Sequence, residues 1–104
     1  MRINDLAKVQ EALDLRRHGQ ARPLNYRVSH QWFILRITAP DLAGNFHLLC
    51  GACERVEFDT HWGPLNIRVE RDGDGFLVHD GAHLRVRCGL IAGEYNVLPV
   101  FGQR

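Results

Sequence analysis

The 104-residue chain has no apolar run near the roughly 20 residues that a membrane-spanning helix needs. Its first residues are polar and lack the apolar core of a secretory signal peptide. These absences predict a cytoplasmic protein of the bacterial type with no membrane partner. Apolar residues make up 45% of the chain, which is enough for one hydrophobic core, so we expect a single domain over residues 1–104.

Cysteine is scarce, and the count of three is odd, which argues against a disulfide framework. Cys50 and Cys53 form a CxxC pair, which supplies half of the four ligands of a structural zinc site. Only Cys88 remains to extend that set, and His47 is the one candidate for a fourth ligand. The residues after Cys53 alternate like a strand, whereas a thioredoxin-like CxxC begins a helix.

A large surplus of positive charge is also missing. The chain has 13 basic and 12 acidic residues, and its net charge is +1. A nucleic-acid-binding domain usually shows a stronger basic surplus, so we do not expect a nucleic-acid partner. Four arginines are nevertheless close together in the N-terminal part of the chain. They can meet an anion, although a solvated helix end is the favoured interpretation given the small total charge: Arg16, Arg17, Arg22 and Arg27.

No glycine-rich loop of the phosphate-binding kind opens a helix in this chain. Residues 72–75 (DGDG) begin like a calcium-binding loop. The fifth and twelfth positions of such a loop need oxygen ligands, but they hold Phe76 and His83 here. This segment is therefore predicted to be a hairpin turn.

Residues 4–18 have the pattern of one amphipathic helix. Leu6 and Leu13 recur at helical spacing, and Asn4 is a favourable N-cap residue. Gly19 follows the last turn as a typical helix stop. A single apolar stripe predicts that the helix lays one face against a sheet.

The rest of the chain reads as short strands separated by turns. Segments 24–28 and 32–38 come first, a meander spans 46–89, and a last strand covers 94–101, where Pro99 favours a sheet edge. The predicted fold class is α+β. In it, the N-terminal helix packs on a mostly antiparallel meander of five to seven strands, which can curl into a partial barrel.

The length of each turn in the meander is predicted by requiring that the apolar residues of the two flanking strands lie on the same face. A three-residue turn at 51–53 puts Leu48 on the face of Val56 and Phe58, whereas a two-residue turn sets Leu48 opposite Arg55. The remaining predicted turns continue this pattern at residues 63–64, 72–73 and 80–82.

The same turns gather polar residues on the opposite face of the meander. They place His79 directly opposite His83, and two imidazoles that close can bind a transition metal or exchange a proton. The simpler interpretation is that these histidines are solvated and that Asp59 pairs with Arg68 on the surface. The candidate ligand-binding residues are His61, Asn66, His79, His83 and Asp59. No serine or cysteine nucleophile faces these histidines, so no catalytic residue is predicted.

We therefore expect a non-catalytic module that binds a small ligand or a protein partner without a cofactor. A sheet edge offers a route to a homodimer. Two alternatives involve a metal. One is a metal-binding domain or metal-dependent enzyme that uses His79 and His83, and the other is a structural zinc site on Cys50, Cys53 and Cys88.

Overall fold

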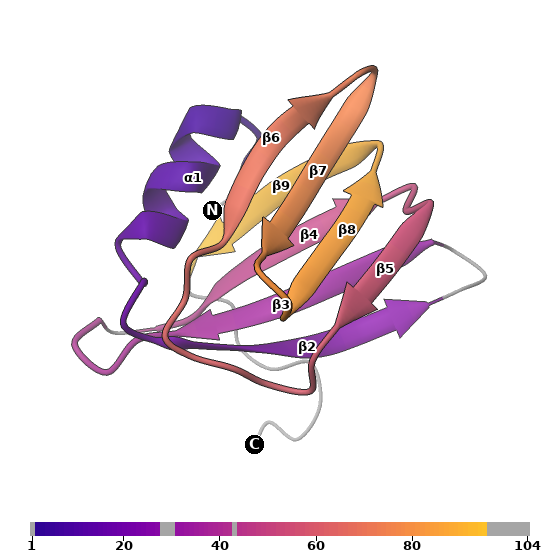
Figure 1. Cartoon of the computed structure of the whole chain (residues 1–104). Helices are drawn as coiled ribbons and strands as arrows, with labels where there is room; N and C mark the ends of the chain where they lie inside the picture. The colour runs from indigo at the N-terminus through magenta and orange to yellow at the C-terminus, as the bar shows by residue number, and fades with distance from the viewer. Residues whose placement is uncertain (1, 28–30, 43, 96–104) are drawn as a thin grey trace.

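The computed structural model describes residues 2–27, 31–42 and 44–95, which form two antiparallel sheets that face each other (Figure 1). The first sheet has the strand order β1-β9-β4-β3-β2, and the second has the order β5-β8-β7-β6. The elements are β1 (Arg2–Ile3), α1 (Leu6–Asp14), β2 (Gln20–Arg27), β3 (Trp32–Thr38), β4 (Phe46–Gly51), β5 (Arg55–Phe58), β6 (Arg68–Asp72), β7 (Gly75–Asp80), β8 (Leu84–Cys88) and β9 (Leu90–Tyr95).

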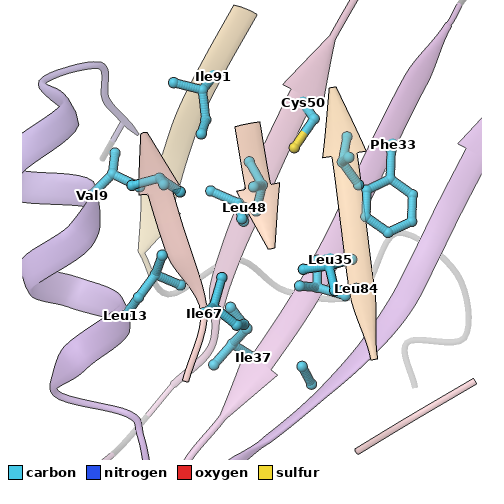
Figure 2. Packing of buried hydrophobic residues seen from close by; sticks show 14 of the residues in the cluster. Val9, Leu13, Phe33, Leu35, Ile37, Leu48, Cys50, Ile67, Leu84 and Ile91 are labelled. Atoms are coloured by element: carbon cyan, nitrogen blue, oxygen red, sulfur yellow. The ribbon is translucent and has the colours of Figure 1, made fainter. Parts of the chain in front are cut away.

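The hydrophobic core lies between the two sheets, where alternate residues of each strand point inward (Figure 2). In β3, Phe33, Leu35 and Ile37 are fully buried, and the residues between them are not. Val78 and Val86, in the second sheet, are equally buried and belong to the same cluster. Burying each such side chain contributes about 1.5–3 kcal/mol, so sheet-on-sheet packing dominates the stability.

The helix α1 lies at one open side of this sandwich, beside β6 (Figure 1). Val9, Ala12 and Leu13 are buried in the common core. Gln10 accepts a hydrogen bond from the Val69 amide at 2.8 Å, and its side-chain amide donates to the Ile67 carbonyl at 2.9 Å. These bonds protect the exposed edge of β6. The sequence predicted that the helix would cover the apolar face of the sheet. In the structure, the second sheet covers that face of the first sheet instead.

The α+β class and the antiparallel strands of the sequence prediction are confirmed, but the single meander is wrong in its first half. β4 pairs with β3 and β9, not with β5, so residues 52–54 carry the chain from one sheet to the other. Residues 59–67 form a loop rather than a hairpin at 63–64. The physical reason is that all six residues of β4 are buried, which requires a neighbouring strand on each side. The two sheets remain separate and do not close into a barrel.

The hairpins β6–β7 and β7–β8 do form, but each is shifted by two residues from the predicted register. Val69 faces Val78 instead of Phe76. His79 faces Arg85 instead of His83. A shift of two residues leaves every side chain on its original face, so the inward apolar pattern is retained while the cross-strand partners change.

The helix is shorter than the predicted segment 4–18, and its cap differs. Asp5, not Asn4, is the N-cap, and its carboxylate accepts hydrogen bonds from the amides of Ala7 (2.9 Å) and Lys8 (3.2 Å). Strand 32–38 is confirmed as β3. The predicted strand 94–101 overlaps the end of β9, and its part from residue 96 lies outside the described residues. No helix in the described ranges is long and apolar enough to cross a membrane.

The two neighbouring cap candidates give a direct stability test. Asp5→Ala is expected to lower the free energy of unfolding by about 1 kcal/mol, because two helix amides lose their acceptor. The matched control Asn4→Ala is expected to stay within about 0.5 kcal/mol of the wild type. Urea denaturation measures both, and an equal cost at the two positions would contradict the cap assignment.

Candidate functional site

A pocket of about 590 Å³ opens where the outer faces of β2 and β3 meet the loop 59–67. β2 contributes Gln20, Ala21 and Arg22, β3 contributes Arg36 and Thr38, and the loop contributes Thr60 and His61.

Strand alternation explains why polar side chains gather here. Ala21 is directly opposite Ile37, and both point into the core with at most 1% of their surface exposed. The residues on either side of them therefore point to the outer face. Two cross-strand pairs result, which are Gln20 with Thr38 and Arg22 with Arg36.

The pair Arg22–Arg36 is electrostatically unfavourable. Like charges directly opposite each other on neighbouring strands destabilise a sheet. Among the described residues, neither guanidinium has a carboxylate or any other hydrogen-bond partner. Arg2, Arg55, Arg68 and Arg87 each lie within 4.0 Å of a carboxylate, whereas Arg17, Arg71 and Arg85 lack such a pair in the described ranges, as Arg22 and Arg36 do. Only Arg22 and Arg36 among these five face each other across two strands. The pocket therefore contains two positive charges that the described part of the protein does not neutralise.

The cross-strand pairs continue from Arg36 onto β4 and β9, and they bring no free carboxylate to the two arginines. Arg36 faces His47 of β4, and His47 faces Glu94 of β9. Burial, and to a lesser extent the charge of Arg36, lowers the pKa of His47, whereas Glu94 acts in the opposite direction. Glu94 itself accepts a hydrogen bond from Arg2 at 2.9 Å. Glu94, the one carboxylate in this line of cross-strand neighbours, is thus already paired with Arg2.

His47 also stands out by its hydrogen bonding. Its Nε2 is the one buried side-chain nitrogen or oxygen without a hydrogen-bond partner in the part of the chain that the structure describes. A buried polar atom left unsatisfied costs about 1–3 kcal/mol. His47 and the Arg22–Arg36 pair form one polar row across the outer face of the first sheet. The unsatisfied Nε2 atom and the repulsion between the arginines both reduce the stability of the fold.

The loop that supplies Thr60 and His61 is anchored by Trp62. The amide of Trp62 donates to the Ala21 carbonyl at 3.0 Å, and the Ala21 amide donates to the Trp62 carbonyl at 2.9 Å. The indole Nε1 of Trp62 donates to the buried carboxylate of Asp80 at 2.8 Å, which also accepts from the Asn66 amide at 3.0 Å. These bonds fix the loop against β2, and so they fix one wall of the pocket.

The histidine row expected on the polar face is not assembled. His61 is in the pocket, but His79 pairs with Glu70, and Asn66 contacts Asp80 through its backbone amide. His83 lies in the turn after β7, and the residue opposite His79 is Arg85. The correction has two causes, which are the two-residue shift of the hairpins and the absence of a hairpin at 63–64.

Asp59 and His83 are two of the candidate ligand-binding residues that do come together. The Nδ1 atom of His83 lies 2.7 Å from an Asp59 carboxylate oxygen, and the imidazole stacks on the Trp62 ring at 5.8 Å between centroids. Both side chains are about half exposed, and neither lines the pocket. The pair therefore acts as a second support for the loop 59–67.

The three cysteines are free and buried. Cys50 lies on the inner face of β4, whereas His47 lies on its outer face, so His47 does not join the thiols as a ligand. Across residues 2–27, 31–42 and 44–95, no group of three or more histidine, cysteine, aspartate or glutamate side chains is arranged to hold a metal ion. Neither metal alternative, on His79 and His83 or on the cysteines, gains support.

Of the four arginines that the sequence places close together near the N-terminus, only one lines the pocket among the described residues. Arg22 is part of the site, but Arg16 is buried, donates to the Ala12 carbonyl at 3.0 Å, and lies over the Phe46 ring at 5.3 Å. Arg36 was missed because it is distant from the cluster in sequence. The predicted strand 24–28 also began too late, because β2 spans Gln20–Arg27 and so brings Arg22 opposite Arg36.

The Asp80–Trp62 bond can be tested with a double-mutant cycle. Asp80→Ala is expected to lower the free energy of unfolding by about 2–3 kcal/mol, because two donors lose their acceptor in a buried site. Trp62→Phe removes the indole donor but keeps an aromatic ring. A coupling energy of at least about 0.5 kcal/mol between the two changes is expected, whereas additive effects would contradict the bond.

The buried imidazole predicts a pH dependence of stability. Since the pKa of His47 is lowered in the folded state, the unfolded chain binds a proton first as the pH falls through about 6.5. The contribution of His47 to stability is therefore complete above that pH and decreases below it. The stability difference between the wild type and His47→Leu, measured by urea denaturation, is expected to move in favour of the leucine variant between about pH 7.5 and about pH 5.5. A constant difference would contradict this.

Comparison with known proteins offers no family and no function to set beside this geometry. No protein-family model matches the chain, and no curated protein or solved structure matches it either.

Proposed function

We propose that the chain is a non-catalytic module that binds a small anionic ligand in the pocket between β2, β3 and the loop 59–67. The observation that carries this proposal is the pair Arg22–Arg36, which lies opposite across two strands without a neutralising partner among the described residues. A bound anion would convert the repulsion of this pair into attraction to a shared partner.

The lining favours a ligand with two negative charges on one compact group. Arginine presents a planar fork of donors that matches the oxygens of a phosphate or a carboxylate. Two such forks suit a dianion better than a single carboxylate. Thr38, Thr60 and Gln20 add neutral hydrogen-bonding groups around the charges. The volume of about 590 Å³ falls within the usual range for small-molecule sites.

The lining also favours binding over catalysis. Among its described residues, no threonine hydroxyl is hydrogen-bonded to a base, so no activated nucleophile is present. The one aspartate–histidine pair near the loop, Asp59 with His83, does not line the pocket. The groups that do line it can hold and orient an anion by charge and hydrogen bonding.

Titration with inorganic phosphate, followed by backbone amide NMR shifts and calorimetry, tests the proposal. Phosphate is expected to shift the amides of the pocket residues on β2, β3 and the loop. Arg22→Gln and Arg36→Gln are each expected to weaken binding about 10-fold or more, because each removes a charge-assisted hydrogen bond. Added salt is expected to weaken binding as well, since the pocket is open to solvent.

Arg55→Gln is the matched control, because Arg55 is an exposed strand arginine that pairs with Glu57 on the second sheet. It is expected to leave phosphate binding unchanged. The proposal is wrong if all three variants bind phosphate equally, or if the shifted amides are spread over both sheets. Unchanged thermal unfolding of the variants without phosphate would show that the binding loss is local.

A further inference from the structure

The two sheets end in four edge strands, and three of these edges are protected against pairing with another chain. Gln10 of α1 is hydrogen-bonded to the backbone of β6, and β1 has only two residues. β2 contains Pro23, which has no backbone N–H group, and its Ala21 is bonded to Trp62. The fourth edge strand, β5, pairs only with β8 among the described strands. Its other edge is therefore available to a further strand.

The backbone of β5 directs hydrogen-bonding groups to this free edge. The amide of Asp59, directly after the strand, donates to the His83 carbonyl at 2.9 Å, so it points toward the β8 side. The backbone groups of an antiparallel strand point alternately to its two edges. The N–H and C=O groups of Val56 and Phe58 therefore point away from β8. Groups in this position form hydrogen bonds with an added strand.

The charged side chains of β5 have an order that fits a second copy of the same strand. Arg55 and Glu57 are exposed, flank Val56 on the outer face, and bond to each other within the chain. When two copies of β5 run antiparallel with their Val56 residues opposite each other, Arg55 of each copy faces Glu57 of the other. Opposite charges in such cross-strand positions stabilise a sheet.

We propose that two copies of this chain form a dimer through β5, with a two-fold axis at Val56. The Val56 amide of each subunit donates to the carbonyl of Val56 of the partner subunit. Arg55 of each subunit pairs with Glu57 of the partner subunit. The second sheets of the two subunits then form one continuous antiparallel sheet, and neither subunit keeps a bare β5 edge.

Charge selects this axis over the two alternatives that lie one residue away. An axis at Glu57 would place the two Glu57 side chains opposite each other, and an axis at Arg55 would do the same with the two Arg55 side chains. Like charges in these positions destabilise a sheet. Val56 is therefore the position at which the charged side chains of both subunits meet favourable partners.

Exposed aromatic side chains extend this surface. β2 and β5 lie on the side of the sandwich that is far from α1 (Figure 1). They bring together Phe58, which is 39% exposed, and Tyr26, which is 42% exposed, with ring centroids 6.1 Å apart. The Phe58 ring also packs against the buried Phe33 ring at 5.1 Å, which holds it in place. Aromatic residues are enriched in protein interfaces, and these two rings add apolar area beside the paired strands.

The dimer surface and the anion pocket use different parts of the chain. Gln20 and Arg22 line the pocket at the beginning of β2, whereas Tyr26 is near the end of that strand. Neither Arg55 nor Glu57 lines the pocket. Arg22→Gln is therefore expected to leave the dimer intact, and failure of either proposal leaves the other standing.

Sedimentation velocity tests the dimer. Runs from about 5 to about 500 μM bracket the dissociation constant on the order of 10–100 μM that a small interface predicts. Arg55→Glu and Glu57→Arg are each expected to weaken the dimer about 10-fold or more, because like charges then face each other. An equimolar mixture of these two variants is expected to restore it as a heterodimer, in which opposite charges face each other again.

Arg71→Glu is the matched control, because Arg71 is an exposed arginine on β6, the opposite edge strand of the same sheet. It is expected to leave the dissociation constant unchanged. A second measurement needs no variant. In the wild-type chain, the backbone amide NMR shifts that change with protein concentration are expected to centre on Val56 and Phe58 and to include Tyr26.

The proposal is wrong if the wild-type chain remains monomeric at the highest concentration. It is also wrong if the Arg55→Glu and Glu57→Arg variants dimerise as the wild type does, if Arg71→Glu weakens the dimer equally, or if mixing the two variants fails to restore it. Concentration-dependent shifts centred on another strand would place the contact elsewhere and would contradict it too.

Discussion

The burial of β4 on both of its faces is the constraint on which the rest of the structure depends. A strand that is buried on both sides needs a paired neighbour at each edge and a packed layer over its inner face. β3 and β9 provide the edges, and the second sheet provides the layer. The same strand carries His47 on its outer face and Cys50 on its inner face. The polar row beside the pocket therefore crosses β4 on the face opposite to the core.

Local patterns in the sequence predicted the parts of the fold that depend on local chemistry. The alternation of β3 gave its bounds, and turn residues located the hairpins that join β6, β7 and β8. The residues predicted to face inward in these hairpins do face inward, because the predicted register was wrong by two residues, which is an even number. The pairing of β4 with β9 was not predictable in the same way. It joins segments that are far apart in the chain, so no local pattern indicates it.

The candidate site shows the same division between local and distant information. Arg22 was singled out because it belongs to a cluster along the chain, and Arg36 was missed because it becomes its neighbour only through the β2–β3 pairing. The predicted histidine row failed because cross-strand partners depend on register to the residue. His79 meets Arg85 instead of His83, although it lies on the predicted face. Faces can be read from a single sequence more securely than partners.

Electrostatic cost at the pocket is the strongest argument that something binds there. The Arg22–Arg36 repulsion and the unsatisfied Nε2 of His47 lie in one row, and both work against folding. Elsewhere in the described sheets, arginines such as Arg68 and Arg87 are paired with carboxylates. A ligand that binds only the folded chain stabilises it by about 2.7 kcal/mol when its concentration is about 100 times its Kd. A bound dianion would supply this gain beside the Arg22–Arg36 pair, where no carboxylate of the described chain lies.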